Sequence, residues 1–166
     1  SCSSSTTSAS IDNNTVTFNA LADGTYDNCT ISVTDSASNA SSTLDVNTFV
    51  VDTTAPTVSS IYPTENQSGV SISTNISVTF SEAMDNTSVT TNTDNTTCYG
   101  SFQLSSDNFS SCIQMSSTPS ISNSGKTYTI VPSDNLSYVT THKIRVTTGV
   151  KDSAGKTMSS QYESSN

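Results

Sequence analysis

Residues 128–132 are Tyr128-Thr129-Ile130-Val131-Pro132, and residues 143–147 are Lys143-Ile144-Arg145-Val146-Thr147. Both runs, like the earlier Val78-Thr79-Phe80, alternate apolar with polar side chains. A period of two places the apolar side chains on one face of a strand, and stacked antiparallel sheets bury such a face while the other stays wet. Each run is also too short for a buried helix. The pattern therefore predicts stacked antiparallel sheets.

Short turns separate these runs at the spacing of an immunoglobulin-like sandwich. An acidic turn, Ser81-Glu82-Ala83-Met84-Asp85, follows the first run, and Val150-Lys151-Asp152-Ser153-Ala154-Gly155-Lys156 follows the last. Gly125 and Gly155 are expected in turns. We predict an all-β fold with candidate strands at 57–62, 70–73, 75–81, 87–91, 99–104, 112–116, 126–131 and 142–149.

The composition favours an ordered protein that binds no nucleic acid. Of 166 residues, 31% are apolar and only 11% are charged, and Thr, Val and Ile recur at strand spacing, which separates the chain from disordered sequences. A net charge of −9, with five basic residues, argues against a phosphate-binding surface. No signal peptide or membrane span is visible, so we expect a mature chain or an excised part of one.

The segment 50–58 divides the chain into two units. Pro56 cannot donate a ladder hydrogen bond and biases Ala55 to an extended conformation, so one strand ends before it and another starts near Val58. The predicted units are residues 1–54 and 55–166. In the first we expect strands at 14–19, 29–34 and 42–51, with turns at 21–26 and 35–39.

Four cysteines indicate disulfides rather than zinc, because none lies in a C-x-x-C motif or near the single histidine. Four cysteines allow three connectivities, and we expect Cys2–Cys29 and Cys98–Cys112, because the other two would join the units across the boundary. Disulfides imply an exported protein. A lipid-modified Cys2 is the alternative, and it would leave Cys29 unpaired.

The sequence carries no convincing catalytic constellation, and we predict that the chain is not an enzyme. His142 has no motif that would place a nucleophile beside it. Glu82 and Asp85 resemble a glycosidase pair by residue type, but they lie in a turn after a buried strand, where carboxylates commonly organise the backbone.

The first unit resembles a repeat of bacterial adhesins and biofilm proteins, which carry an L-x-DGTY…T-D-x-A-G-N…F-x-x-D-T-T-A-P signature. The matching segments are 21–26, 34–39 and 49–56, and Ser38 stands where the family has Gly. The resemblance implies a partial Ig-like domain over 1–54, because the unit starts roughly two strands late for a complete sandwich.

The second unit resembles the Ig-like domain of S-layer and related surface proteins. The marks are Pro63 with Gly69-Val70, the 78–85 and 150–155 segments, and Tyr128…Pro132…Leu136, with Lys156 where Asn is common. The resemblance implies two tandem sandwiches at a bacterial cell surface or outside the cell. It also implies that the second unit, 55–166, stops before its last strand. The chain would then be a window of a longer array, or its open sheet edges would be completed by neighbouring repeats or identical subunits.

Calcium is the expected cofactor, if there is one. Asp23, Asp35 and Asp52 occupy positions that often lie near the domain junction in the adhesin repeats. Carboxylates from several loops supply the oxygen ligands that Ca²⁺ prefers. The alternative is that Asp52 accepts hydrogen bonds from the Thr53 and Thr54 backbone, and that Asp35 caps its own turn.

Together these features favour a structural module that spaces or assembles an extracellular protein or filament. A binding module for a surface glycan or a receptor is the alternative, because Tyr99 and Phe109 lie in the segment around Cys98 and Cys112 and could contact a sugar, unless they fill the core. An accessory domain of an enzyme is the third interpretation.

Overall fold

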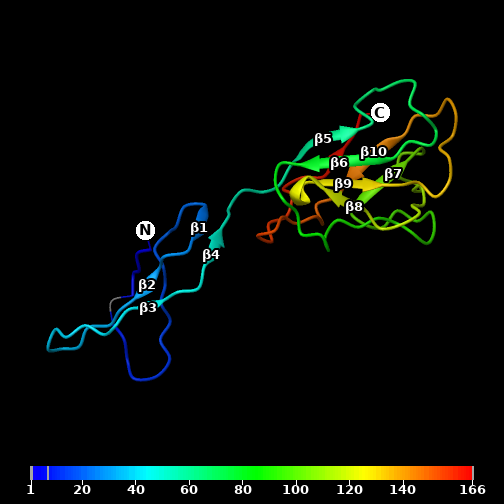
Figure 1. The fold of residues 1–166 in the computed structure, drawn as a ribbon. Coiled ribbons are helices and arrows are strands. Elements are labelled where there is room, and N and C mark those ends of the chain that lie inside the picture. The colour runs from blue at the N-terminus through cyan, green and yellow to red at the C-terminus, as the bar shows by residue number, and fades with distance from the viewer. Residues whose placement is uncertain (1, 7, 166) are drawn as a thin grey trace. The chain divides into compact units, whose positions relative to one another are not determined.

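The computed structural model describes residues 2–6 and 8–165, so the outer limits of the predicted units, residues 1 and 166, lie outside the described residues. Contacts between Cα atoms divide the chain into Ser1–Thr54 and Ala55–Asn166, called here unit 1 and unit 2. The described residues form β-strands and one 3-10 turn, η1 (Asn123–Gly125), and contain no α-helix (Figure 1). The all-β prediction is confirmed.

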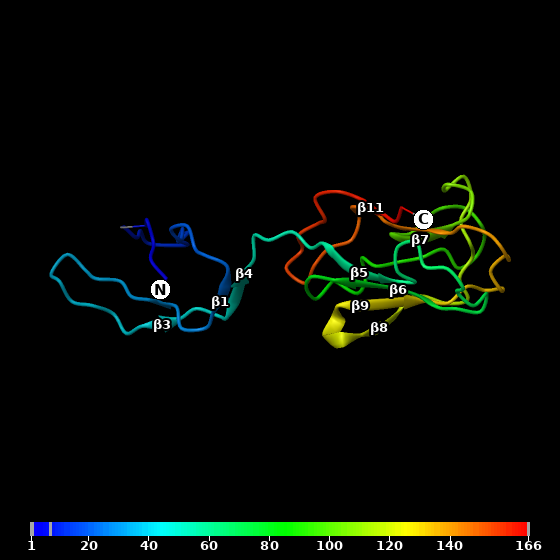
Figure 2. The same ribbon diagram turned by 90° about the horizontal axis from the view of Figure 1, so that it is seen from above.

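Unit 2 is a sandwich of two antiparallel sheets. One sheet has the order β5-β6-β9-β8 and the other the order β11-β10-β7, and Figure 2 shows them as facing layers. The strands are β5 (Val58–Tyr62), β6 (Ile76–Phe80), β7 (Phe102–Ser105), β8 (Ser120–Ser122), β9 (Thr127–Ile130), β10 (Lys143–Val146) and β11 (Tyr162–Glu163).

The alternation of side chains builds the core between the two sheets. In β6 the side chains of Ile76, Val78 and Phe80 are buried, and the intervening residues are half-buried. In β10 the buried pair is Ile144 and Val146. These residues belong to one buried cluster in unit 2. The period-two pattern in the sequence therefore correctly indicates which side chains of these strands face the core.

One aromatic pair fixes the packing at the centre of this core. The rings of Phe80 and Tyr128 meet edge to face, with centroids 5.9 Å apart. The Tyr128 hydroxyl donates a hydrogen bond of 2.7 Å to Oδ1 of Asn86. Edge-to-face packing and a satisfied hydroxyl are the arrangement that a buried tyrosine favours. Burial raises the pKa of Tyr128, and the charge of Asp85 adds to the rise.

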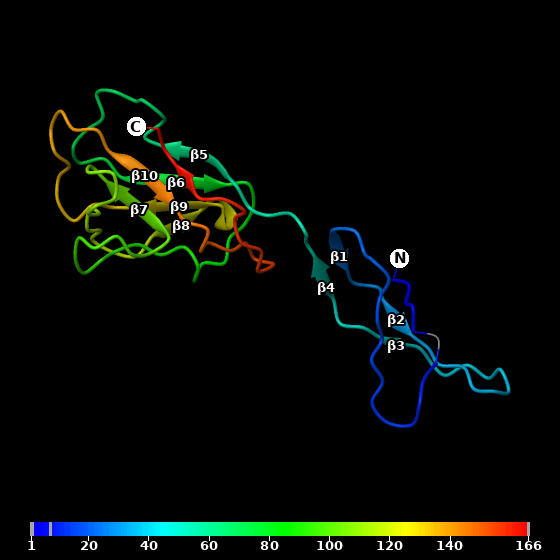
Figure 3. The same ribbon diagram turned by 180° about the vertical axis from the view of Figure 1, so that it is seen from behind.

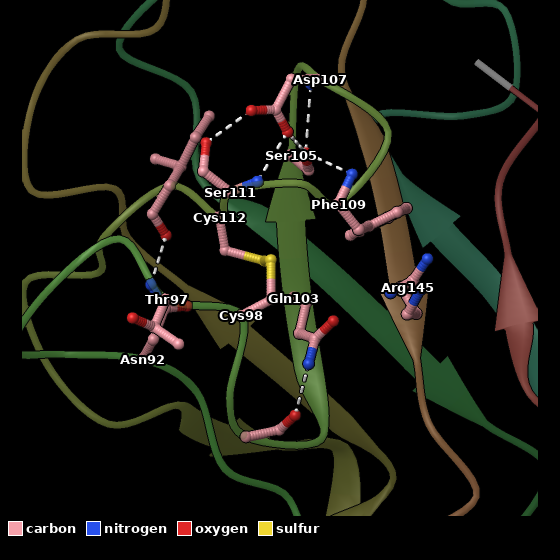
Figure 4. Close-up of a disulfide and its surroundings, with 12 residues drawn as sticks. Asn92, Thr97, Cys98, Gln103, Ser105, Asp107, Phe109, Ser111, Cys112 and Arg145 are labelled. Atoms are coloured by element: carbon pink, nitrogen blue, oxygen red, sulfur yellow. Dashed lines mark hydrogen bonds between the residues drawn. A yellow bond between two sulfur atoms is a disulfide. The ribbon is translucent and has the colours of Figure 1, made fainter.

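Strand β7 is buried on both of its faces, unlike its neighbours. Gln103 and Ser105 alternate with Phe102 and Leu104, and all four side chains are buried. Polar residues on the outer face of a sheet are usually exposed to solvent, so other parts of the chain must cover Gln103 and Ser105. β7 itself lies within the segment that the Cys98–Cys112 disulfide closes (Figure 4), and the Gln103 and Ser105 side chains bond within that segment, to the Gly100 carbonyl and to Asp107.

Unit 1 consists of short ladders and a small aromatic stack. β1 (Gly24–Tyr26) pairs with β4 (Phe49–Val51), and β2 (Thr30–Ile31) pairs with β3 (Leu44–Asp45), both antiparallel. The ring of Phe49 stacks on Phe18 at 5.5 Å and on Tyr26 at 5.3 Å. The Cys2–Cys29 disulfide joins two further segments of the unit. A complete sandwich in this part of the chain stays a prediction.

Three predicted strands of unit 2 are wrong, and in two of them local hydrogen bonds close turns instead. At 70–73 the Thr74 N–H donates to the Ser71 carbonyl at 3.1 Å. At 87–91 the Ser88 N–H donates to the Asp85 carbonyl at 2.9 Å. The 112–116 segment forms only a single bridge, Met115 to Pro132. Ser and Thr hydroxyls also compete for the backbone in such segments, which is why β propensity alone overstated them.

Other strands appear where none was predicted. β8 and β11 are short and pair with β9 and β10, respectively. β1 occupies part of the predicted turn 21–26, and only Phe18 of the predicted strand 14–19 forms a bridge, with Ser4. Strands of two or three residues carry too little periodicity to be recognised in a sequence.

Candidate functional site

A disulfide-closed loop carries the two aromatic residues that the sequence singled out. The Cα atoms of Cys98 and Cys112 are 4.9 Å apart. The Cys112 N–H donates to the Thr96 carbonyl, and the Ile113 N–H to the Leu104 carbonyl, both at 2.8 Å. The disulfide closes the segment 98–112, which contains β7, and these two bonds tie its end to Thr96 and to β7. The predicted Cys98–Cys112 and Cys2–Cys29 pairs are both bonded in the structure.

Asp107 organises the end of this loop (Figure 4). Its Oδ1 accepts hydrogen bonds from the Ser105 hydroxyl at 2.8 Å and from the Ser111 N–H at 2.9 Å, and its Oδ2 accepts from the Ser111 hydroxyl at 2.6 Å. These bonds, those from Ser111 first, lower the pKa of Asp107 to about 2. The carboxylate is therefore a structural acceptor that stays ionised near neutral pH.

Phe109 is covered on one side by a cation. The Arg145 guanidinium lies 3.5 Å from the centroid of the Phe109 ring, within the range of a cation–π contact. Arg145 in turn donates to Oε2 of Glu163 from Nε at 3.2 Å and from a terminal nitrogen at 3.1 Å. One face of the ring is thus occupied, which leaves less aromatic surface for a sugar.

Tyr99 projects further into solvent, with 39% of its surface exposed. Its hydroxyl donates to Oδ1 of Asp94 and accepts a hydrogen bond of 2.9 Å from the Thr93 N–H. Neither Tyr99 nor Phe109 belongs to the buried cluster of unit 2, so these rings do not fill the sandwich core. Contact with a glycan stays a prediction.

The three aspartates predicted as calcium ligands lie in two places within unit 1. Asp23 and Asp52 both bond to the segment after β4: Asp23 accepts from the Thr53 N–H at 2.9 Å, and Asp52 from the Thr54 N–H at 3.0 Å. Asp35 closes its own turn, where Oδ1 accepts from the Ala37 and Asn39 N–H groups at 2.9 Å. Hydrogen bonds, first from the side chain and then from the backbone of Asn39, lower the pKa of Asp35.

These three carboxylates do not form a cluster among the described residues. Asp23 and Asp52 share one segment, and Asp35 lies at the tip of another turn. Asp52 and Asp35 accept hydrogen bonds of the kind that the alternative interpretation predicted, whereas Asp23 accepts from Thr53, which is distant in the sequence. Calcium at these aspartates stays a prediction.

A further carboxylate, which the sequence alone did not mark as a ligand, is buried in unit 2. Asp152 has an exposed fraction of 1%. Its Oδ1 accepts from the Ala154 N–H at 2.8 Å and from the Lys156 N–H at 2.9 Å. Its Oδ2 is buried and has no hydrogen-bond partner. The only sequence signal for this burial was its position: Asp152 comes shortly after the apolar Val150, in a turn that contains Gly155.

A groove opens at the end of unit 2 where β5 stops. Its volume is about 760 Å³, and its walls come from the 61–72 segment and the 136–144 segment. Tyr138 and Val139 on its rim are fully exposed or nearly so. His142 lines the groove, and its Nδ1 lies 3.1 Å from the Thr140 carbonyl oxygen. Burial lowers the pKa of His142, which is half-buried.

The described geometry of unit 2 can be compared with known proteins. The family of bacterial Ig-like domains matches residues 52–165, which is more than half of the chain. The chain belongs to the bacterial Ig-like domain family. A search of curated proteins gives no match. Within the described residues, no helix of this Ig-like protein has the length and apolar character of a membrane span.

Solved structures of a bacterial S-layer protein, SbsC, are similar to part of this Ig-like chain. The N-terminal part of SbsC aligns with 22% identity and a TM-score of 0.47 over 66% of this chain and 23% of its own. A structure of SbsC domains 1–6 gives 22% identity and a TM-score of 0.47 over 67% of this chain and 13% of its own. The chain thus spans less than a quarter of the solved structures that it matches.

Proposed function

We propose that this chain is a structural Ig-like module of a bacterial extracellular or cell-surface protein, which acts as a spacer or assembly unit. The observation that carries the proposal is the path of the chain through unit 2. The chain passes from Ala55 into β5 at one end of the sandwich. Near its last described residues, Ser165 N–H donates a hydrogen bond of 2.8 Å to Glu65, which follows β5 at the opposite end.

Figures 1 and 3 both show the final segment of the chain beside the far end of β5. A domain whose polypeptide enters at one end and leaves at the other adds its own length to a tandem array. A domain with both connections at one end would instead project sideways from the array and would not add to its length. The acidic composition, with a net charge of −9, further suits a spacer that does not bind surrounding molecules nonspecifically.

Mechanical unfolding tests the spacer role. We expect the whole chain, held by handles at both ends, to resist extension and unfold in discrete steps. The disulfide shields the chain between Cys98 and Cys112, a separation of 14 residues. Reduction should therefore lengthen the unfolding step of unit 2 by about 50 Å, at about 3.5 Å per residue. Smooth extension without a resistive step contradicts a spacer.

The proposed partners are identical subunits or neighbouring repeats. Strand β8 is an edge strand that pairs only with β9 among the described strands, and its three residues are exposed. An exposed edge is the template for strand addition. Light scattering at rising concentration should show association that a Ile121→Lys substitution in β8 weakens. Monomers at every concentration would restrict the role to a spacer.

An adhesive module for a surface carbohydrate is the second candidate, because Tyr99 and Phe109 lie outside the core. The discriminating measurement is a glycan array with the wild-type chain and with Tyr99→Ala and Phe109→Ala. Binding that both substitutions abolish supports adhesion. The absence of binding by the wild type favours the spacer, and the Arg145 contact on Phe109 is the physical reason to expect that result.

A further inference from the structure

Backbone hydrogen bonds join two turns of unit 2 that are far apart in the sequence. The first follows β6 and contains Glu82. The second, residues 150–156, contains Asp152. The Asp85 N–H donates to the Lys151 carbonyl at 2.8 Å, and the Ser153 N–H donates to the Ala83 carbonyl at 3.0 Å. Met84 and Asp152 form an antiparallel bridge between these bonds. The pairing brings the side chains of Glu82 and Asp152 to neighbouring positions.

The carboxylates of Glu82 and Asp152 offer oxygen atoms that lie within 4.8 Å of each other. Two ionised carboxylates this close repel, and the repulsion is stronger where one of them is removed from water. Two oxygens bound to the same Ca²⁺ lie at most about 5 Å apart, because each Ca–O distance is about 2.3–2.6 Å. The separation is therefore one that a shared calcium ion accommodates.

Asp152 supplies a second and independent observation. The residue is 1% exposed, and Oδ1 already accepts two backbone N–H groups of its own turn. Oδ2 is buried without any hydrogen-bond partner. Buried polar atoms are nearly always satisfied, and an exception indicates a water or an ion that the protein atoms do not include. A cation would satisfy this buried oxygen and would also offset the repulsion from the neighbouring carboxylate.

We propose that Glu82 and Asp152 bind a calcium ion, which clamps the turn after β6 to the turn at 150–156. Oxygen-only ligands on irregular turns suit Ca²⁺, which takes 6–8 oxygens in flexible geometry, so water completes the coordination. Zinc instead selects Cys and His ligands, and neither occurs within these two turns. The clamp joins the end of a strand in one sheet to the connection that leads from β10 to β11 in the other.

Calorimetry on the whole chain tests the site directly. The chain is first stripped with EDTA and then titrated with CaCl₂. We expect one ion to bind and the melting temperature of unit 2 to rise with calcium. Glu82→Gln, which keeps the size of a half-buried side chain, should weaken this binding at least about tenfold, since calcium affinity follows the number of charged ligands. Asp134→Asn, at an exposed aspartate elsewhere in unit 2, is the matched control and should bind as the wild type does.

Asp152→Asn extends the test, but Glu82→Gln decides it because the buried Asp152 also holds its own turn. Circular dichroism establishes that each variant is folded. No heat of calcium binding by the wild type up to millimolar concentrations would overturn the proposal. Unchanged affinity in Glu82→Gln would overturn it as well, and loss of that binding in Asp23→Asn would assign the ion to unit 1. None of these outcomes depends on whether the chain is a spacer.

Discussion

The hydroxyl of Tyr162 donates a hydrogen bond of 2.7 Å to the carboxylate of Glu65. Tyr162 belongs to β11 in one sheet, and Glu65 follows β5 in the other sheet. The same carboxylate accepts hydrogen bonds from the N–H and the hydroxyl of Ser165. Glu65 therefore ties the last strand of unit 2 to the opposite layer, at the end of the sandwich where the chain leaves it.

Replacing Tyr162 with Phe should destabilise unit 2. The substitution removes one hydrogen bond to a charged acceptor, and such a bond contributes about 1–2 kcal/mol to the free energy of unfolding. Urea unfolding of both chains measures the difference. Tyr138→Phe is the control, because Tyr138 is 78% exposed and lies outside the buried cluster. Equal stabilities of Tyr162→Phe and the control would show that the bond does not hold β11.

Tyr162 also predicts how stability changes in alkali. Burial, followed by the hydrogen bond and the charge of Glu65, raises the pKa of Tyr162 above its ordinary value of 10.0. The folded state thus favours the protonated phenol, and its stabilising effect is fully present below pH 10.0 and lost as the pH rises further. The free energy of unfolding should begin to fall near pH 10.0 and keep falling as the pH rises above that value. The fall should be smaller in Tyr162→Phe, and an equal fall would contradict the assignment.

A third prediction concerns the turn at Ser38. Its backbone φ is +70°, a left-handed conformation that glycine adopts without the steric cost of a Cβ. Ser38→Gly should therefore raise the stability of unit 1 by about 0.5–1 kcal/mol, after the greater entropy of glycine in the unfolded chain is subtracted. Thermal unfolding followed by near-ultraviolet circular dichroism measures it. Ser36→Gly in the same turn, where φ is not positive, should destabilise or have no effect.

Ser38 also illustrates what local sequence can predict. The turn 35–39 was recognised from its Asp, Ser and Asn residues, and Ser38, where the adhesin repeats that this segment resembles have Gly, is at the left-handed position in the structure. The inward faces of β6, β9 and β10 were recognised for a similar reason, because period-two alternation is a local property. The Asp23-Gly24 step misled the prediction, since Gly24 begins β1 rather than completing a hairpin turn.

The site residues were harder to predict because their environments depend on distant segments. Cysteine spacing placed Tyr99 and Phe109 on a loop, but nothing in the sequence indicated that Arg145 would lie on the Phe109 ring. Asp152 is one of many aspartates in turns. Its burial depends on the pairing of its turn with the segment around Ala83, which no local pattern reports.

The loss of folding stability at low pH should depend on Asp107. Hydrogen bonds from Ser111 and Ser105 lower its pKa from 3.8 to about 2. A carboxyl group with a depressed pKa stabilises the fold above pH 3.8, and the stabilising effect is lost as the pH falls towards about 2. A titration by NMR should show the Asp107 carboxyl protonating near the lower value. Ser111→Ala removes the largest cause and should raise the pKa of Asp107, whereas Ser110→Ala should leave it unchanged.

Gly100 should be the least replaceable glycine of unit 2. It has a φ of +80°, and an added Cβ would lie 2.8 Å from the Thr91 Cα and 2.9 Å from the Thr90 carbonyl oxygen. These are backbone atoms that cannot rotate away, so Gly100→Ala forces the start of β7 apart from the 90–92 segment. We expect a loss of at least about 3 kcal/mol, because overpacking and left-handed strain act together.

Gly69→Ala separates the two causes in that prediction. Gly69 also has a positive φ, +69°, but a Cβ there would meet nothing within 4 Å. Only the conformational cost remains, so Gly69→Ala should lose about 1–2 kcal/mol. Urea unfolding of the two variants gives the difference, which is the contribution of the close approach between Gly100 and Thr91. Equal losses in both would mean that the 90–92 segment can move away from the start of β7, and that the buried polar face of that strand does not depend on this contact.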